Sequence, residues 1–300
     1  MQTRMFQNTV GRVIRGVVAV MVFIMVAGNV SAGGQKSSGS QGASGRPITV
    51  ISREDGSGTR SAFVELFEVL DANKKDNTVA GAEITNNTAV MMTSVAGDRN
   101  AIGYLSLGSL NSTVKALKID GAAATAAAIK NGSYKIFRPF YIAVRNDVSD
   151  AAKDFIAFIT SADGQAIVSS SGYLPLDNVT ATAPARTASG TKVVVAGSSS
   201  VTPLMEKVRE AYIKKYPGVD IEIQQSDSST GMNSTIDGIC DIGMASRELK
   251  QSELDKGITG IVIATDGIAV IVNKENPLDG LTKAQVKAIY SGGVTDWSTL

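Results

Sequence analysis

Residues 48–60 read Ile-Thr-Val-Ile-Ser-Arg-Glu-Asp-Gly-Ser-Gly-Thr-Arg. The β-branched residues at the start favour a strand, and the glycines and hydroxyl residues that follow favour a tight polar loop. Residues 61–70 then place a phenylalanine or leucine at every third or fourth position, which is typical of one apolar helix face. This segment therefore predicts a strand over 48–52 and a helix over 61–70, joined by a very polar loop.

The same order of strand, small polar loop and helix recurs along the chain. The further predicted strands are Lys192–Ala196, Val219–Gln225 and Ile242–Ala245, and the further predicted helices are Pro203–Tyr216, Gly231–Asp237 and a helix that ends at Tyr290. Thr282 and Gln285 form a capping box at the start of that last helix. Alternating strands and helices predict an α/β fold with mainly parallel sheets.

Composition restricts the classes of function. With 29 basic and 28 acidic residues, the net charge of +1 gives no long-range attraction for nucleic acid, so we expect no nucleic-acid partner. The chain has no histidine, which excludes histidine general bases, histidine metal clusters and Ser-His-Asp triads. Its single cysteine, Cys240, excludes an internal disulfide and any site with several cysteine ligands. We therefore predict no metal, no cofactor and no catalytic residue.

The first 46 residues differ from the rest of the chain. Three arginines precede an uncharged run over 16–28 and a cleavage-like Val30-Ser31-Ala32, so residues 1–32 predict an export signal that leaves the protein in the periplasm or at the outer face of the cytoplasmic membrane. Asn29 stands where a lipoprotein signal has its cysteine. Residues 33–46 predict a flexible tether, and residues 181–190 predict a linker.

Three predicted junctions between a strand and a helix share one chemistry. They are the segments 52–60, 197–203 and 226–231, and each places hydroxyl residues and glycine or proline at a helix start. A helix N-terminus attracts anions through unpaired N–H groups, and Arg53 adds a planar donor fork. Simple N-capping explains any one junction, but three in one chain favour a shared anion site.

Five segments resemble the substrate-binding protein of bacterial phosphate ABC importers: residues 51–60, 100–107, 196–203, 241–249 and 266–273. The resemblance implies a two-lobed fold like that of type II periplasmic binding proteins. It also implies that the protein binds inorganic phosphate outside the cytoplasmic membrane for a membrane permease and catalyses nothing. We expect a monomer.

Carried over position by position, the resemblance implies phosphate contacts at Arg53, Ser57, Gly58, Thr59, Ser199, Ser200, Ser228 and Ser246. Some relatives carry an aspartate at the position of Ser246, which accepts the proton of hydrogen phosphate. Here Asp55 is the first candidate for that role, followed by Asp227 and Asp266. Asp55 can equally form a salt bridge that orients Arg53.

The order of segments differs from the family's. In relatives the segment like 196–203 opens the mature chain and the segment like 51–60 follows, whereas here the order is reversed. We interpret this as circular permutation; the alternative is a fragment that spans two copies in a tandem array. Permutation predicts one lobe from 46–142 with 271–300 and another from 143–270, with crossover strands near Phe140–Val144 and Ile268–Val272.

Three other functions stay open at this point. The same fold could bind another oxyanion, such as sulfate or molybdate. A phosphatase could use the same anion site, although no spacing in the sequence supports a Ser-Lys pair or a carboxylate-bound metal. A surface sensor or adhesin could have kept the fold and lost transport.

Overall fold

The computed structural model describes residues 45–179 and 192–300. The predicted signal over 1–32 with Asn29, nearly all of the tether over 33–46, and the linker over 181–190 lie outside the described residues. Across the part that is described, no helix combines the length and the apolar character needed to cross a membrane.

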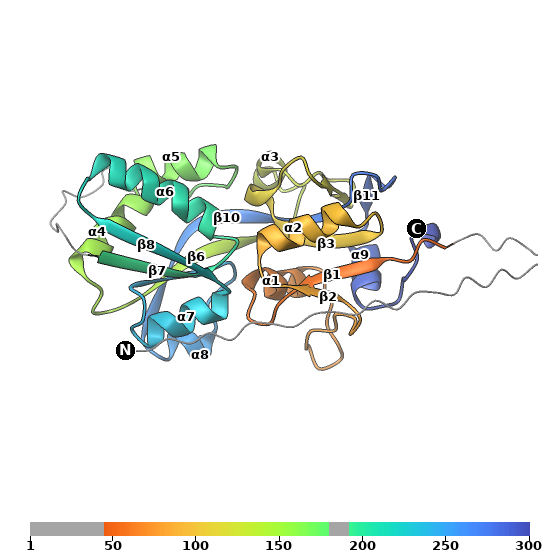
Figure 1. Ribbon diagram of the computed structural model, residues 1–300, viewed down its shortest axis with the longest axis horizontal. Coiled ribbons are helices and arrows are strands. Elements are labelled where there is room, and N and C mark those ends of the chain that lie inside the picture. Colours follow the sequence, from red (N-terminus) through yellow and green to blue (C-terminus); the bar gives the residue numbers. More distant parts are fainter. Residues whose placement is uncertain (1–44, 180–191) are drawn as a thin grey trace, which may run out of the picture. The chain divides into compact units, whose positions relative to one another are not determined.

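Strands and helices alternate along the chain (Figure 1). The strands are β1 Thr49–Arg53, β2 Glu83–Thr85, β3 Ala101–Ser106, β4 Lys115–Ala116, β5 Lys118–Ile119, β6 Phe137–Arg145, β7 Lys192–Ser198, β8 Asp220–Ser226, β9 Ile242–Ala245, β10 Ile258–Val272 and β11 Gly280–Leu281. The α-helices are α1 Gly58–Leu66, α2 Thr88–Gly97, α3 Ala126–Lys130, α4 Asp150–Ile159, α5 Ala162–Ser170, α6 Thr202–Lys215, α7 Ser228–Ile236, α8 Gln251–Leu254 and α9 Lys283–Tyr290. Two short 3-10 turns, Leu107–Ser109 and Trp297–Thr299, complete the described elements.

The strands follow the same spatial order twice. In the first half the order is β2-β1-β3-β10, and in the second half it is β8-β7-β9-β6. Each half pairs its first three strands in parallel and adds one antiparallel strand. Figure 1 shows α5 and α6 on one side of the second set of strands and α7 on the other. The prediction of an α/β fold with mainly parallel pairing is confirmed.

Two long antiparallel strands connect the halves. β10 pairs with β6 from Ile258 to Gly267 and with β3 from Ile268 to Val272, so one strand belongs to both halves. The register places Asp266 opposite Arg138, and it shifts between Val262 and Ala264. These strands are the places where the chain crosses between the halves.

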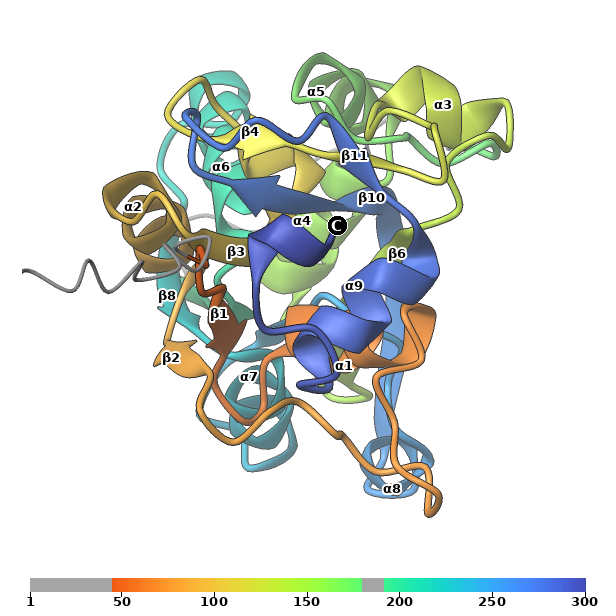
Figure 2. The ribbon, with the colours of Figure 1, turned by 90° about the vertical axis from the view of Figure 1, so that its right-hand side faces the viewer.

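Two large hydrophobic cores lie on either side of these crossover strands. The first draws its buried residues from 50–136 and 268–297, and the second from 140–264. We call the half around the first core lobe A and the half around the second core lobe B. In lobe A, Phe63 of α1 stacks on Tyr104 and meets the edge of Tyr290 of α9, and Figure 2 shows α1 and α9 side by side.

Local sequence signals set most element boundaries. β9 has the predicted bounds, and the capping box of Thr282 and Gln285 starts α9 as predicted. The helix predicted over 61–70 instead ends at Leu66, because Glu68 adopts a left-handed backbone with φ of 57°. α7 starts at Ser228 rather than Gly231, because the Asp227 side chain accepts a hydrogen bond from Thr230 N–H and caps the helix there.

The last residues of the chain lie beside the start of β1. Ile48 N–H donates to Thr295 O at 2.9 Å, and Trp297 N–H donates to Arg46 O at 2.9 Å. The Trp297 indole also donates to Asn100 O at 2.9 Å. Residues 45–48 and 295–300 are therefore neighbours in space.

Candidate functional site

The candidate site begins where β1 ends and α1 begins. Ser57 caps α1 by accepting a hydrogen bond from Arg60 N–H, and Gly58 and Thr59 form the buried first turn of the helix. A Cβ at Gly58 would lie only 2.4 Å from Ser228 Oγ and 2.8 Å from Ser246 Oγ. Since such distances are too short for carbon and oxygen, only glycine lets α1 approach lobe B this closely.

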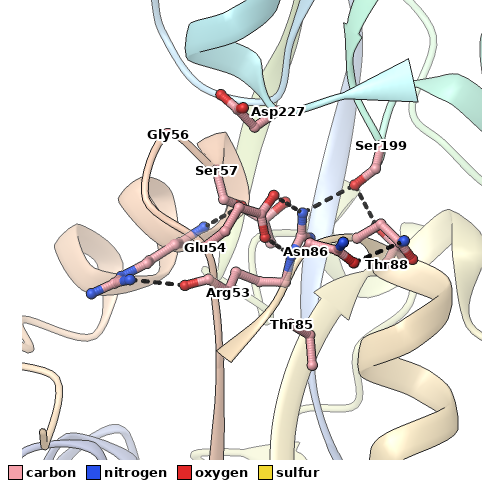
Figure 3. A network of polar contacts seen from close by, with 12 residues as sticks. Arg53, Glu54, Gly56, Ser57, Thr85, Asn86, Thr88, Ser199 and Asp227 are labelled. Atoms are coloured by element: carbon pink, nitrogen blue, oxygen red, sulfur yellow. Dashed lines mark hydrogen bonds and ion pairs between the residues drawn. The ribbon is translucent and has the colours of Figure 1, made fainter. Parts of the chain in front are cut away.

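Arg53 is the last residue of β1, and its side chain is only 1% exposed. Its Nε and Nη2 donate to the two carboxylate oxygens of Glu54, each at 2.7 Å, and Nη2 also donates to Ser199 Oγ of lobe B at 3.0 Å (Figure 3). Among the described residues, Nη1 is buried and has no hydrogen-bond partner. The guanidinium is thus held along one edge and keeps a free donor inside the protein. Lobe B covers this side chain, so Arg53 is not an exposed cleft residue.

Buried hydroxyl groups from both lobes gather beside Arg53. Thr59 Oγ1 of lobe A lies 2.7 Å from Ser200 Oγ and 3.4 Å from Ser246 Oγ of lobe B. Ser228 Oγ lies 3.5 Å from Ser246 Oγ and accepts a hydrogen bond from Ser246 N–H at 3.1 Å. The structure therefore brings the three predicted junctions together at one place between the lobes.

Two further residues of this cluster were not predicted. Thr88 starts α2, and its Oγ1 lies 3.4 Å from Ser199 Oγ and 3.2 Å from Ser200 Oγ. Ser198 donates to Ser246 Oγ at 2.9 Å. The sequence signal for Thr88 was a fourth strand-to-helix junction, Thr85-Asn86-Asn87-Thr88, where the Asn87 side chain caps the helix.

The three candidate carboxylates lie outside this cluster. Asp55 is 98% exposed and pairs with Arg60 at 2.9 Å, so the carboxylate that orients Arg53 is Glu54 and not Asp55. Asp227 caps α7, and Figure 3 shows its side chain directed away from Arg53.

Asp266 lies on the crossover strand β10 and pairs with Arg138 at 3.1 Å, and both side chains are buried. Burial raises the pKa of Asp266 to about 6, although Arg138 and hydrogen bonds favour its charged form. Burial likewise lowers the pKa of Arg138 to about 10, against the attraction of Asp266. This buried ion pair joins the two crossover strands directly.

The cluster offers many donors and the Arg53 guanidinium, which is paired with Glu54. Hydroxyls and N–H groups at helix starts can surround an oxyanion without further cations. Within the described ranges, no group of three or more cysteine, aspartate or glutamate side chains is arranged to hold a metal ion. The arrangement is suited to binding a small anion.

Two lobes joined by crossover strands, with buried donors from both lobes meeting between them, define a two-lobed ligand-binding protein. A family model described as a PBP superfamily domain matches residues 28–163 and 180–299. The phosphate-binding protein PstS 2 of Streptococcus agalactiae serotype V is 58% identical over 258 residues, which cover 84% of this chain and 87% of that protein. PstS 2 of Streptococcus pneumoniae serotype 4 is 43% identical over 276 residues, which cover 91% of this chain and 94% of that protein.

A solved structure is similar as well. The crystal structure of a phosphate-binding protein of a phosphate ABC transporter from Streptococcus pneumoniae TIGR4 matches with a TM-score of 0.66 and 42% identity, over 84% of this chain and 99% of that one. The chain therefore belongs to the PBP superfamily and, within it, to the phosphate-binding proteins named PstS.

Proposed function

We propose that this protein binds inorganic phosphate between its two lobes, outside the cytoplasmic membrane, and passes it to the membrane permease of an ABC importer. It acts as a monomer and catalyses nothing. The observation that carries the proposal is the buried Arg53 guanidinium. Its Nη1 is unpaired among the described residues, and its Nη2 donates to Ser199, one of the clustered hydroxyls.

The proposed contacts are Arg53, Ser57, Gly58, Thr59, Ser199, Ser200, Ser228 and Ser246, with Thr88 added. Hydrogen bonds to a charged group contribute about 1.5 to 3 kcal/mol each. Binding in the micromolar range needs about 8 kcal/mol in total. Several such bonds from helix starts reach that range after the cost of ordering the lobes.

The proposal also includes the residue ranges of the two lobes and the order of the segments along the chain. We place the lobe boundaries near 142/143 and 270/271, with 46–142 and 271–300 in lobe A and 143–270 in lobe B. The core changes a few residues earlier, between Ile136 and Phe140 and between Ala264 and Ile268, which supports boundaries within these two crossover strands. Circular permutation is proposed relative to family members other than the two PstS 2 proteins, which match this chain through most of its length. It is supported by the bond from Ile48 N–H to Thr295 O, since joined ends must be neighbours. Residues 1–32 serve as the export signal.

Isothermal titration of the full exported chain tests the function. We expect micromolar or tighter binding of phosphate at neutral pH and much weaker binding of sulfate and molybdate. Equal affinity for all three anions would favour a general oxyanion-binding protein. Steady hydrolysis of a chromogenic phosphate ester by the same sample would favour the phosphatase.

A further inference from the structure

A second contact between the lobes lies next to the hydroxyl cluster and outside it. Gly56 sits in the loop between β1 and α1 of lobe A, and Ser229 is the second residue of α7 in lobe B. Ser229 N–H donates to Gly56 O at 3.2 Å, and Ser229 Oγ donates to the same oxygen at 3.3 Å. One backbone carbonyl of lobe A is therefore held by two donors of lobe B.

Arg247 fixes the position of the Ser229 side chain. Arg247 Nη2 donates to Ser229 Oγ at 3.2 Å, so the hydroxyl accepts from Arg247 while it donates to Gly56. Arg247 is itself held by two bonds to Glu253, at 2.9 and 2.7 Å, and both side chains are buried. Burial opposes the charge of Glu253, yet its hydrogen bonds to Arg247 and to Lys250 N–H keep its pKa below the ordinary value.

Gly56 fits this contact because it has no side chain. Its φ is 87°, a backbone conformation that side chains disfavour. A Cβ there would lie 2.4 Å from Asp227 Oδ1, the group that caps α7. The loop of lobe A can rest against the start of α7 only with glycine at this position.

The geometry points to a latch made of Gly56, Ser229 and Arg247, which holds the lobes together after phosphate is bound and so sets the rate of its release. This inference rests on the proposed function. The hydrogen of the Ser229 hydroxyl is used by Gly56, so Ser229 is a positioning residue and not a phosphate contact. Opening the lobes must break both bonds to Gly56 O, whereas capture by open lobes does not involve them.

Dissociation of radiolabelled phosphate, measured by rapid filtration after a chase with unlabelled phosphate, tests the latch. Loss of one side-chain hydrogen bond costs about 0.5 to 1.5 kcal/mol, so Ser229→Ala should release phosphate about 2 to 12 times faster. The association rate should stay within a factor of about two, because mutations at an interface act mainly on dissociation. Ser229→Thr keeps the hydroxyl and should restore slow release.

Ser234→Ala is the matched control. Ser234 lies further along α7 and is partly buried, and among the described contacts none joins its side chain to the loop of Gly56. We expect wild-type release from this variant. An unchanged release rate in Ser229→Ala, or slower association as the main effect, would overturn the latch.

Hydrogen exchange without phosphate separates this inference from the proposed function. If wild type does not bind phosphate, the proposed function fails. Lobes that close without phosphate still make the bond from Ser229 N–H to Gly56 O, so the latch predicts faster exchange at the Ser229 amide in Gly56→Ala than in wild type. The Ser234→Ala variant should match wild type. Equal exchange at Ser229 in Gly56→Ala and wild type would overturn the latch whatever the ligand.

Discussion

The two lobes share a strand order but contribute different chemistry to the site. Lobe A supplies the guanidinium of Arg53 and the first turns of α1 and α2. Lobe B supplies serine hydroxyls, and its nearby cation, Arg247, is engaged by Glu253. A repeated architecture therefore carries the charged part of the site on one side and neutral donors on the other.

This asymmetry has a physical consequence for an anion bound between the lobes. Arg53 is paired with Glu54, so the site holds little net charge, and the anion must be stabilised mainly by hydrogen bonds. Affinity then depends on donors from both lobes being present together. In the proposed function, tight binding therefore requires both lobes at the anion.

The largest expected effect comes from removing the charged part of lobe A. Arg53→Ala should weaken phosphate binding by about 3 to 6 kcal/mol, because about two charge-assisted hydrogen bonds are lost. That corresponds to a Kd at least about a hundred times higher, which titration calorimetry measures. Arg99→Ala is the control, since Arg99 is a solvent-exposed arginine that pairs with Glu275. Wild-type affinity in Arg53→Ala would show that the charge of lobe A takes no part in binding.

The next largest effect concerns protein stability and the buried ion pair between the crossover strands β6 and β10. Asp266→Ala leaves Arg138 buried without its counter-charge, which should cost about 3 to 5 kcal/mol of unfolding free energy in urea. Asp279→Ala removes an exposed partner of Lys115 and should cost less than about 1 kcal/mol. If both variants are equally stable, the buried pair does not hold the crossover strands together.

Proton binding to Asp266 adds a dependence on pH. Its pKa of about 6 in the folded protein exceeds the ordinary 3.8, so between these values the folded state binds more protons than the unfolded state. Its contribution to stability is therefore greatest below about pH 4 and falls by about 3 kcal/mol as pH rises through 6. Arg138, Tyr173, Ser106 and Gly108 N–H face the carboxylate. The difference in unfolding free energy between wild type and Asp266→Asn should follow this curve; a difference independent of pH would contradict it.

The smallest expected effect concerns one neutral donor of lobe B. Ser228→Ala should weaken phosphate binding by about 1.5 to 3 kcal/mol, roughly ten- to a hundredfold, because it removes one hydroxyl bond to the anion. The fold should be retained, but the urea midpoint should fall, because Ser246 N–H loses its buried acceptor. An effect as large as that of Arg53→Ala would remove the distinction between the lobes.

Much of this arrangement could be predicted from local sequence signals. β9 and the capping box of α9 depend on residues close together in the chain, and the three polar junctions were visible as segments. What the sequence could not supply were the side-chain partners, either within the loop after β1 or across the lobes. Glu54 pairs with Arg53 because Glu54 N–H continues the strand pairing to Thr85 O, whereas Asp55 enters the turn and points to solvent.

The burial of Arg53 and the place of Thr88 in the cluster both depend on contacts between the lobes. Arg53 is covered by Ser199, which lies 146 residues away in the chain, so its exposure depends on how the lobes meet. Thr88 joins the cluster through Ser199 and Ser200 of the other lobe. No spacing within one segment carries that information.

A crystal structure of the protein grown with phosphate tests the central claim most directly. The account predicts one phosphate within hydrogen-bond distance of Arg53 Nη1 and of the Ser199 and Ser228 hydroxyls, with donors from both lobes around it. A phosphate held by one lobe alone, or bound away from Arg53, would contradict it.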